Sequence, residues 1–287
     1  MDLPRTIPAF EIAVERDVPY STADGYWSHA PVGKVWASVR LFFRNFRPKP
    51  VTLDMDIYKP SGDGAEKRPL LLMMHGGSFF FGDKEEAGQA GWCRYFASLG
   101  YVAASINYRL GFHAGKKKFR RAEQRATEDA DAALGYLLGR EDLRIDPDRV
   151  FVAGTSSGAI TALSLAFRRE GRRICAVGNL WGSVHDLSVL ENASSPILSF
   201  QSVNDPVMPY DGGYPIKALS LVTQLFIDRM YGTHAIHEKA LSIGLKSEHH
   251  PCEERRHRLH LDDEGRYTPR FYEIRDAMVK FFAEQME

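Results

Sequence analysis

The sequence predicts an α/β fold, with a mostly parallel central sheet and helices on both of its faces. Short, nearly unbroken apolar runs of strand length alternate with segments whose apolar residues recur at helical spacing, and this alternation is typical of a parallel sheet. In addition, segment 149–167 reads as a buried strand, a very tight turn and a helix in direct succession. Folds of this class place their site at the carboxyl ends of the strands.

Most of the predicted strands are apolar runs bounded by turn-forming residues, whereas 51–58 alternates apolar and polar residues with the period of a half-buried strand. In chain order they cover 10–14, 51–58, 69–74, 101–106, 150–153, 174–180, 196–203 and 246–252. Apolar residues at helical spacing predict helices within 92–99, 126–138 and 160–167, and a further helix that ends near Gly244. Gly100 and Gly139 end the first two of these helices.

The 287 residues fit one large domain. We expect residues 51–287 to form it, and residues 1–50 to make an N-terminal segment that packs on or beside the mouth of the site. An aromatic-rich stretch of that segment comprises Trp36, Val39, Phe42, Phe43 and Phe46. Core packing is our first interpretation of this stretch, and a lid or membrane-contacting face is the second.

Composition argues against several kinds of partner. Lysine plus arginine equals aspartate plus glutamate at 37 each, so no net charge favours nucleic acid or an anionic membrane surface. The basic run 116–121 is followed at once by acidic residues, and we interpret it as a solvated loop and helix start. No window approaches 18 uninterrupted apolar residues, so no membrane span is expected.

The cellular compartment is predicted from the cysteines and from the first residues. Three widely spaced cysteines cannot form a disulfide framework, and the first residues lack the pattern of a signal peptide. We therefore expect a cytoplasmic protein. A secreted protein that had lost its leader would give the same pattern.

The segment Gly154-Thr155-Ser156-Ser157-Gly158 matches the G-x-S-x-G pattern of a nucleophile elbow. Its glycines remove side chains that would collide with neighbouring backbone in so sharp a turn. The turn holds the Ser156 hydroxyl at the end of the strand, where the backbone N–H of Ser157 can donate to a developing oxyanion. A Gly/Ser turn without chemistry is the alternative.

A second pair of glycines follows the predicted strand 69–74. Gly76 and Gly77 come directly after His75, and they let the backbone approach a ligand closely with its N–H groups directed inward. An oxyanion hole requires this property, so we assign Gly76, Gly77 and Ser157 to it. An ordinary strand-to-helix turn is the alternative.

A serine nucleophile requires a base that takes its proton and an acid that orients the base. Asp205 is the predicted acid, because it stands at the carboxyl end of strand 196–203 and just before a proline-bounded turn. An Asx turn or a helix cap is the alternative role for Asp205. Asp211 lies further into the loop and Asp228 lies in a helical pattern, so both are poorer candidates.

The base is sought among four histidines near the C-terminus, His249, His250, His257 and His260. The first two fall inside strand 246–252, whereas His257 falls five residues past its end, within loop reach of the serine. We rank His257 first, His260 second and His250 third. No metal site is expected, because no spacing of these histidines with Cys252 matches a closed tetrahedral site.

Four motifs are informative as a set: His75-Gly76-Gly77, Asn107-Tyr108-Arg109-Leu110-Gly111, Gly154-Thr155-Ser156-Ser157-Gly158 and Asn204-Asp205-Pro206-Val207. Together they resemble α/β-hydrolases of the HGG-type, carboxylesterase-like esterase/lipase family, over about residues 50–285. The order Ser, Asp, His is also that fold's order. Bacterial members often read Gly-His-x-Pro-His at the histidine loop, whereas here Arg256 replaces the glycine and Leu259 the proline. Ser78 replaces a third glycine often found in the oxyanion motif.

The resemblance implies the α/β-hydrolase fold and a serine esterase or lipase that needs no metal and no organic cofactor. In that mechanism Ser156 attacks an ester carbonyl, His257 takes its proton and Asp205 orients the imidazole. The N–H groups of Gly77 and Ser157 stabilise the oxyanion. An acyl-enzyme forms, and water activated by the histidine releases it.

The expected substrates are short-chain acyl esters or carbohydrate and other small-molecule esters. Phe79 and Trp181 are predicted pocket walls, with plain core packing as the alternative, and residues 212–245 are expected to shape the pocket mouth. A ligand-binding protein without turnover would need a broken triad, and none is evident. A serine peptidase is disfavoured, because a propeller domain is missing and Gly158 is followed by Ala159 instead of a second glycine.

Overall fold

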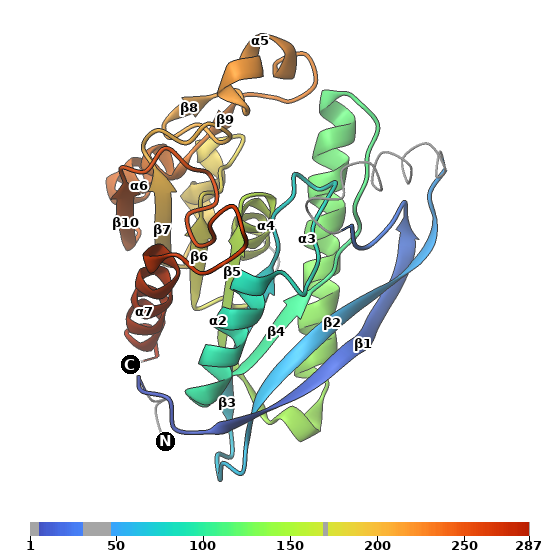
Figure 1. Cartoon of the computed structure of the whole chain (residues 1–287), viewed down its shortest axis with the longest axis vertical. Helices are drawn as coiled ribbons and strands as arrows, with labels where there is room; N and C mark the ends of the chain where they lie inside the picture. The colour runs from blue at the N-terminus through green and yellow to red at the C-terminus, as the bar shows by residue number, and fades with distance from the viewer. Residues whose placement is uncertain (1–5, 31–46, 169–171, 287) are drawn as a thin grey trace.

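The computed structural model describes residues 6–30, 47–168 and 172–286. The predicted aromatic stretch from Trp36 to Phe46 lies outside these residues, so its role stays a prediction. An eight-stranded sheet forms the centre of the molecule, in the order β1-β2-β4-β3-β5-β6-β7-β10 (Figure 1). Its strands are β1 (Glu11–Gly25), β2 (Lys49–Ser61), β3 (Arg68–Met74), β4 (Val102–Ile106), β5 (Ile145–Thr155), β6 (Ala176–Leu180), β7 (Ile197–Ser202) and β10 (Ser247–Cys252).

The sheet is mostly parallel, as predicted. Neighbouring strands from β4 to β10 pair in parallel, whereas β1 and β2 pair antiparallel with each other, as do β2 and β4. β1 is much longer than the predicted strand 10–14, because it pairs with β2 along its whole length. Its polar residues find cross-strand partners there, and Arg16 donates to Asp56 at 2.9 Å.

Helices cover both faces of the sheet (Figure 1). They are α2 (Ala87–Ser98), α3 (Lys116–Leu138), α4 (Ser157–Ala166), α6 (Thr233–Ser242) and α7 (Pro269–Ala283), with a short α5 (Ser220–Thr223). The cores formed by α2 and α7 and by α3 and α4 lie on opposite faces. In β3, Leu70 and Leu72 enter the α3/α4 core, and Leu71 enters the α2/α7 core. Burial on both sides explains why β3 reads as a continuous apolar run.

The parallel strands bring distant loops to one edge of the sheet. Loops that follow β3, β5, β7 and β10 carry the predicted oxyanion glycines, nucleophile, acid and base, respectively. The basic run 116–121 begins α3, as the helix-start interpretation expects. Among the described helices, none combines the length and the hydrophobicity needed to cross a bilayer.

Candidate active site

Ser156 occupies a sharp turn between β5 and α4. Its backbone angles are φ 51° and ψ −118°, a conformation that costs a non-glycine residue free energy and is typical of functional sites. A Cβ atom on Gly154 would overlap the backbone of Gly158, and one on Gly158 would overlap the carbonyl oxygen of Met74. Both glycines are therefore required by the close packing of the turn.

Ser156, His257 and Asp205 form one hydrogen-bonded chain. The Nε2 atom of His257 lies 2.9 Å from the Ser156 hydroxyl, and its Nδ1 atom lies 2.8 Å and 3.0 Å from the two carboxylate oxygens of Asp205. Because a carboxylate only accepts, Nδ1–H donates to Asp205 and Nε2 is left to accept from the serine. This is the geometry that general-base activation of a hydroxyl requires.

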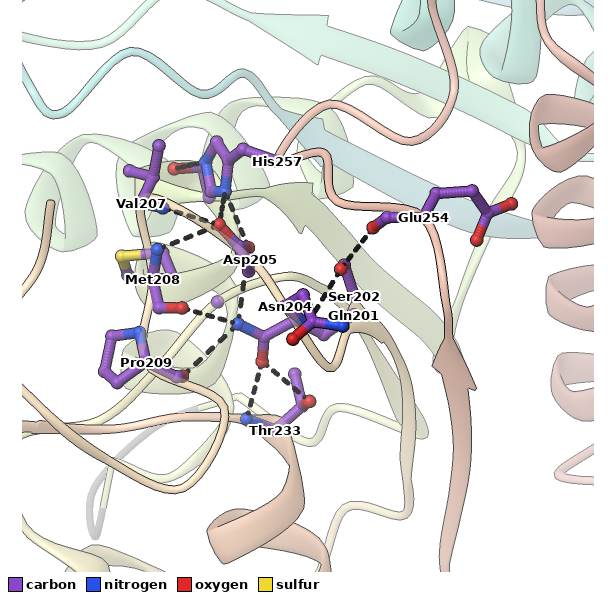
Figure 2. A network of polar contacts seen from close by, with 12 residues as sticks. Gln201, Ser202, Asn204, Asp205, Val207, Met208, Pro209, Thr233, Glu254 and His257 are labelled. Atoms are coloured by element: carbon purple, nitrogen blue, oxygen red, sulfur yellow. Dashed lines mark hydrogen bonds and ion pairs between the residues drawn. The ribbon is translucent and has the colours of Figure 1, made fainter. Parts of the chain in front are cut away.

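The Asp205 carboxylate is held by its own loop as well as by the histidine. Its Oδ1 atom accepts the backbone N–H groups of Val207 at 2.8 Å and Met208 at 3.1 Å (Figure 2). The side chain thus makes both the histidine contact and the Asx-type turn that had been its alternative role. Asp211 instead contacts His234. Asp228 lies outside any helix, contrary to expectation, and bonds Arg120.

The two other candidate bases have different partners. The Nε2 atom of His260 lies 3.1 Å from Glu86, and its ring stacks between Trp92 and Trp181 at centroid distances of 5.1 Å and 5.2 Å. His250 lies in β10, 2.6 Å from Glu248. No group of three or more His, Cys, Asp or Glu side chains within the described ranges is arranged to hold a metal ion.

Glu86 links the histidine loop to the start of α2. Its Oε2 atom accepts the N–H of Gln89 at 3.2 Å, which caps the helix, while Oε1 contacts His260 and lies 3.4 Å from Arg258. Burial raises the pKa of Glu86, but the His260 ring and the Arg258 guanidinium outweigh burial and lower this pKa to about 2. The carboxylate is therefore ionised at neutral pH.

Replacement of Glu86 by glutamine is expected to destabilise the protein in a pH-dependent way. The folded-state pKa of about 2 lies below the ordinary value of 4.5, so the carboxylate stabilises the fold above pH 4.5 and loses this contribution as the pH falls through 2. At about 1.4 kcal/mol per pKa unit, the loss at pH 7 is on the order of 3 kcal/mol. The free energy of unfolding of wild type and Glu86→Gln, measured with urea at pH 7 and pH 3, gives this loss.

The control for this experiment is Glu85→Gln, which removes a neighbouring exposed carboxylate. It should change the free energy of unfolding far less than Glu86→Gln at pH 7. An equal loss in Glu86→Gln at both pH values would contradict the ionised, histidine-paired carboxylate.

A cavity of about 370 Å³ opens above Ser156. Trp181, Val207, Ile216 and His257 contribute walls, together with the backbone of the glycine loop after β3. Trp181 therefore lines the pocket, as predicted from the sequence. Ile216 belongs to the segment 212–245 that was expected to shape the mouth.

Phe79 does not line this pocket, and its prediction as a pocket wall is wrong. The side chain is fully buried and packs edge-on against Tyr108 and Phe119, at centroid distances of 6.5 Å and 5.5 Å. The backbone takes left-handed angles at Ser78 (φ 56°) and Phe79 (φ 58°). This turn directs the aromatic ring into the α3/α4 core and away from Ser156.

The glycines predicted to form the oxyanion hole lie beside Ser156. Gly76 and Gly77 both border the cavity that contains Ser156. Gly77 has φ 120°, and a Cβ atom there would overlap the carbonyl of Phe81, so the loop requires glycine at this position. Ser157 is the first residue of α4, where a backbone N–H has no partner within the helix.

Comparison with known proteins gives partial sequence matches. The protein-family model BD-FAE matches residues 55–176. Gut esterase 1 of Caenorhabditis elegans is 31% identical over 116 residues, which are 39% of this chain and 20% of that protein. The gibberellin receptor of Oryza sativa subsp. japonica is 33% identical over 125 residues, covering 40% of this chain and 32% of the receptor. The chain thus spans less than a third of the length of these curated relatives.

A solved structure covers much more of the chain. The apo form of Thermogutta terrifontis esterase 2 superposes with a TM-score of 0.60 and 18% sequence identity, over 82% of this chain and 90% of that one. At this identity the likeness establishes the fold, while the HGG and elbow motifs fall within the family-model match. The chain therefore has the α/β-hydrolase fold, and its matched segment resembles esterases and related proteins.

Proposed function

We propose that this protein is a serine hydrolase that cleaves carboxylic esters through an acyl-enzyme. The observation that carries the proposal is the hydrogen-bonded chain from Ser156 through His257 to Asp205, at 2.9 Å and 2.8 Å, beside an open cavity. A nucleophile, a base and an orienting acid in this geometry are what acyl transfer needs.

In the proposed reaction, the Ser156 hydroxyl attacks the ester carbonyl carbon while His257 Nε2 takes the hydroxyl proton. The backbone N–H groups of Gly77 and Ser157 stabilise the oxyanion, each worth on the order of 10²–10³ in rate. The protonated histidine then gives its proton to the departing alcohol. In the second half, Nε2 takes a proton from water as the water oxygen attacks the acyl carbon. The histidine then returns this proton to Ser156 Oγ as the acyl–oxygen bond breaks and the acid leaves.

The proposed substrates are short-chain acyl esters or esters of carbohydrates and other small molecules. A cavity of about 370 Å³ with Trp181, Val207 and Ile216 in its wall supports a small, partly apolar acyl group. We also propose that residues 1–50 pack beside the pocket mouth. Ala30 forms an antiparallel bridge with Gly82, and Gly82 borders the cavity, which supports this placement.

A cytoplasmic location is part of the proposal. Cys93, Cys175 and Cys252 are buried free thiols, which is compatible with a reducing compartment.

A ligand-binding protein without turnover is the second candidate function, because a gibberellin receptor is among the relatives. The complete Ser156–His257–Asp205 chain favours the esterase over this candidate.

A series of p-nitrophenyl esters from acetate to long acyl chains tests the proposed function. We expect turnover that is highest for the short chains, together with a covalent adduct on Ser156 after treatment with an organophosphonate, detected by peptide mass spectrometry. A binding protein with a dead site would give neither turnover nor adduct. That result would reject the esterase proposal.

A further inference from the structure

Gln201 is a fully buried amide at the end of β7, four residues before Asp205. Its Nε2 atom donates to Asp205 Oδ2 at 3.3 Å and to the carbonyl oxygens of Met208 at 3.1 Å and Pro209 at 3.2 Å. Its Oε1 atom accepts the backbone N–H of Thr233 at 3.1 Å and the Thr233 hydroxyl at 2.8 Å. Figure 2 shows these contacts converging on one side chain, between the acid loop and the start of α6.

The partners leave this amide only one orientation. The backbone N–H of Thr233 is a donor, so the atom that faces it must be the amide oxygen. Three acceptors surround the other end, so the NH₂ group must face Asp205. The NH₂ group has two hydrogens for three acceptors, and one hydrogen is therefore shared.

The direction of the Thr233 hydroxyl follows from the same reasoning. A carbonyl oxygen cannot donate, so the hydroxyl gives its one proton to Gln201 Oε1. His249 Nε2, at 3.1 Å, must then donate to the hydroxyl oxygen. Burial, with His237, His234 and His250 nearby, lowers the pKa of His249 to about 4, which keeps this ring neutral at pH 7.

We propose that Gln201 is a positioning residue, whose amide is aligned by Thr233 and holds Asp205 and its loop in the place where the carboxylate meets His257. The inference rests on the proposed esterase function. The loop needs this support, because Val207 borders the cavity above Ser156 and no helix or strand includes residues 205–209. Without the amide, a buried carboxylate and two loop carbonyls lose a donor, at a cost of about 1–3 kcal/mol for each group left unsatisfied.

Gln201→Met tests the proposal, since methionine has a similar length and cannot replace these hydrogen bonds. We expect kcat for p-nitrophenyl acetate to fall roughly 10- to 100-fold, as for a displaced catalytic group, with little change in KM. The far-downfield proton resonance of His257 Nδ1–H should shift or broaden. This resonance is measured without turnover.

A pair of substitutions at Thr233 separates hydrogen bonding from packing. Thr233→Val keeps the shape and removes the hydroxyl, whereas Thr233→Ser keeps the hydroxyl and removes the methyl group. We expect kcat to fall in the valine variant and to stay close to wild type in the serine variant. If only packing mattered, kcat would fall in the serine variant and stay close to wild type in the valine variant. That result would overturn the proposal even if Gln201→Met did not fold.

Asn107→Leu is the matched control. Asn107 is another buried amide, bonded to Asp54 and to the backbone N–H of Lys84, and its side chain does not line the cavity. The Asn107→Leu variant should have a lower free energy of unfolding than wild type and an unchanged kcat. A Gln201→Met variant that also loses only stability, with an unmoved His257 resonance, would contradict the positioning role. If wild type cleaved no ester but the resonance still moved in Gln201→Met, the esterase proposal would fail and the positioning role would stand.

Discussion

Ser156→Ala is expected to lower kcat for p-nitrophenyl acetate by on the order of 10⁴- to 10⁶-fold, with the fold intact. Loss of the hydroxyl leaves the histidine and the oxyanion donors without a nucleophile, so only the residual catalysis of the remaining site persists. The substitution removes one oxygen from a site that already has room around it. Initial rates measured over several substrate concentrations, with circular dichroism as the check on folding, give the result.

Ser195→Ala is the control for this serine. Ser195 is also buried, and its hydroxyl donates to the carbonyl oxygen of Ile174. Ile174 lies just before the first residue of β6 and Ser195 just before the first residue of β7, whereas Ser156 follows the last residue of β5. The control should keep wild-type turnover. Activity in Ser156→Ala that equals wild type would show that another group performs the attack, and the elbow would lose its proposed role.

His257→Ala is expected to cause a loss of the same order, about 10⁴- to 10⁶-fold in kcat, because the base and the nucleophile act as a unit. His260→Ala is its natural comparison, three residues away. His260 contacts Glu86 and two tryptophans but not the nucleophile. Its loss should therefore reduce stability by about 2–3 kcal/mol while kcat stays within about tenfold of wild type.

Turnover and urea unfolding of both histidine variants, measured side by side, separate these roles. The expected pattern is an inactive, stable His257→Ala and an active, less stable His260→Ala. The reverse pattern in kcat would assign the base to His260. Comparable kcat losses in both variants would indicate that the stacked ring between Trp92 and Trp181 also holds the loop that carries the base.

Local sequence patterns predict the tight turn at Ser156 and the sheet well. The elbow depends on glycines whose positions are dictated by overlap with nearby backbone. Residues 70–74 of β3 and 150–153 of β5 are apolar because both faces of the sheet are buried there. Such requirements act over a few residues and are visible in the sequence. Asp205 also follows from its position at a strand end.

Features that depend on distant partners were harder to predict. β1 extends to Gly25 because β2 pairs with it, and nothing in the polar residues 15–17 indicates this. Phe79 points into the core because of the left-handed turn that begins at Ser78, a conformation that non-glycine residues rarely adopt. Gln201 has one sequence signal, namely an amide next to the predicted acid in a strand that otherwise contains only apolar residues and serines.

The separation of the triad along the chain has a consequence for biosynthesis. Ser156 and His257 are 101 positions apart, and the base comes after the last strand of the sheet. After the turn at Ser156 has left the ribosome, the residues of β6, β7 and β10 must still be synthesised before the His257 imidazole can reach the Ser156 hydroxyl. We therefore expect nascent chains to lack the proposed activity until His257 has been synthesised, even if the strands before it have already folded.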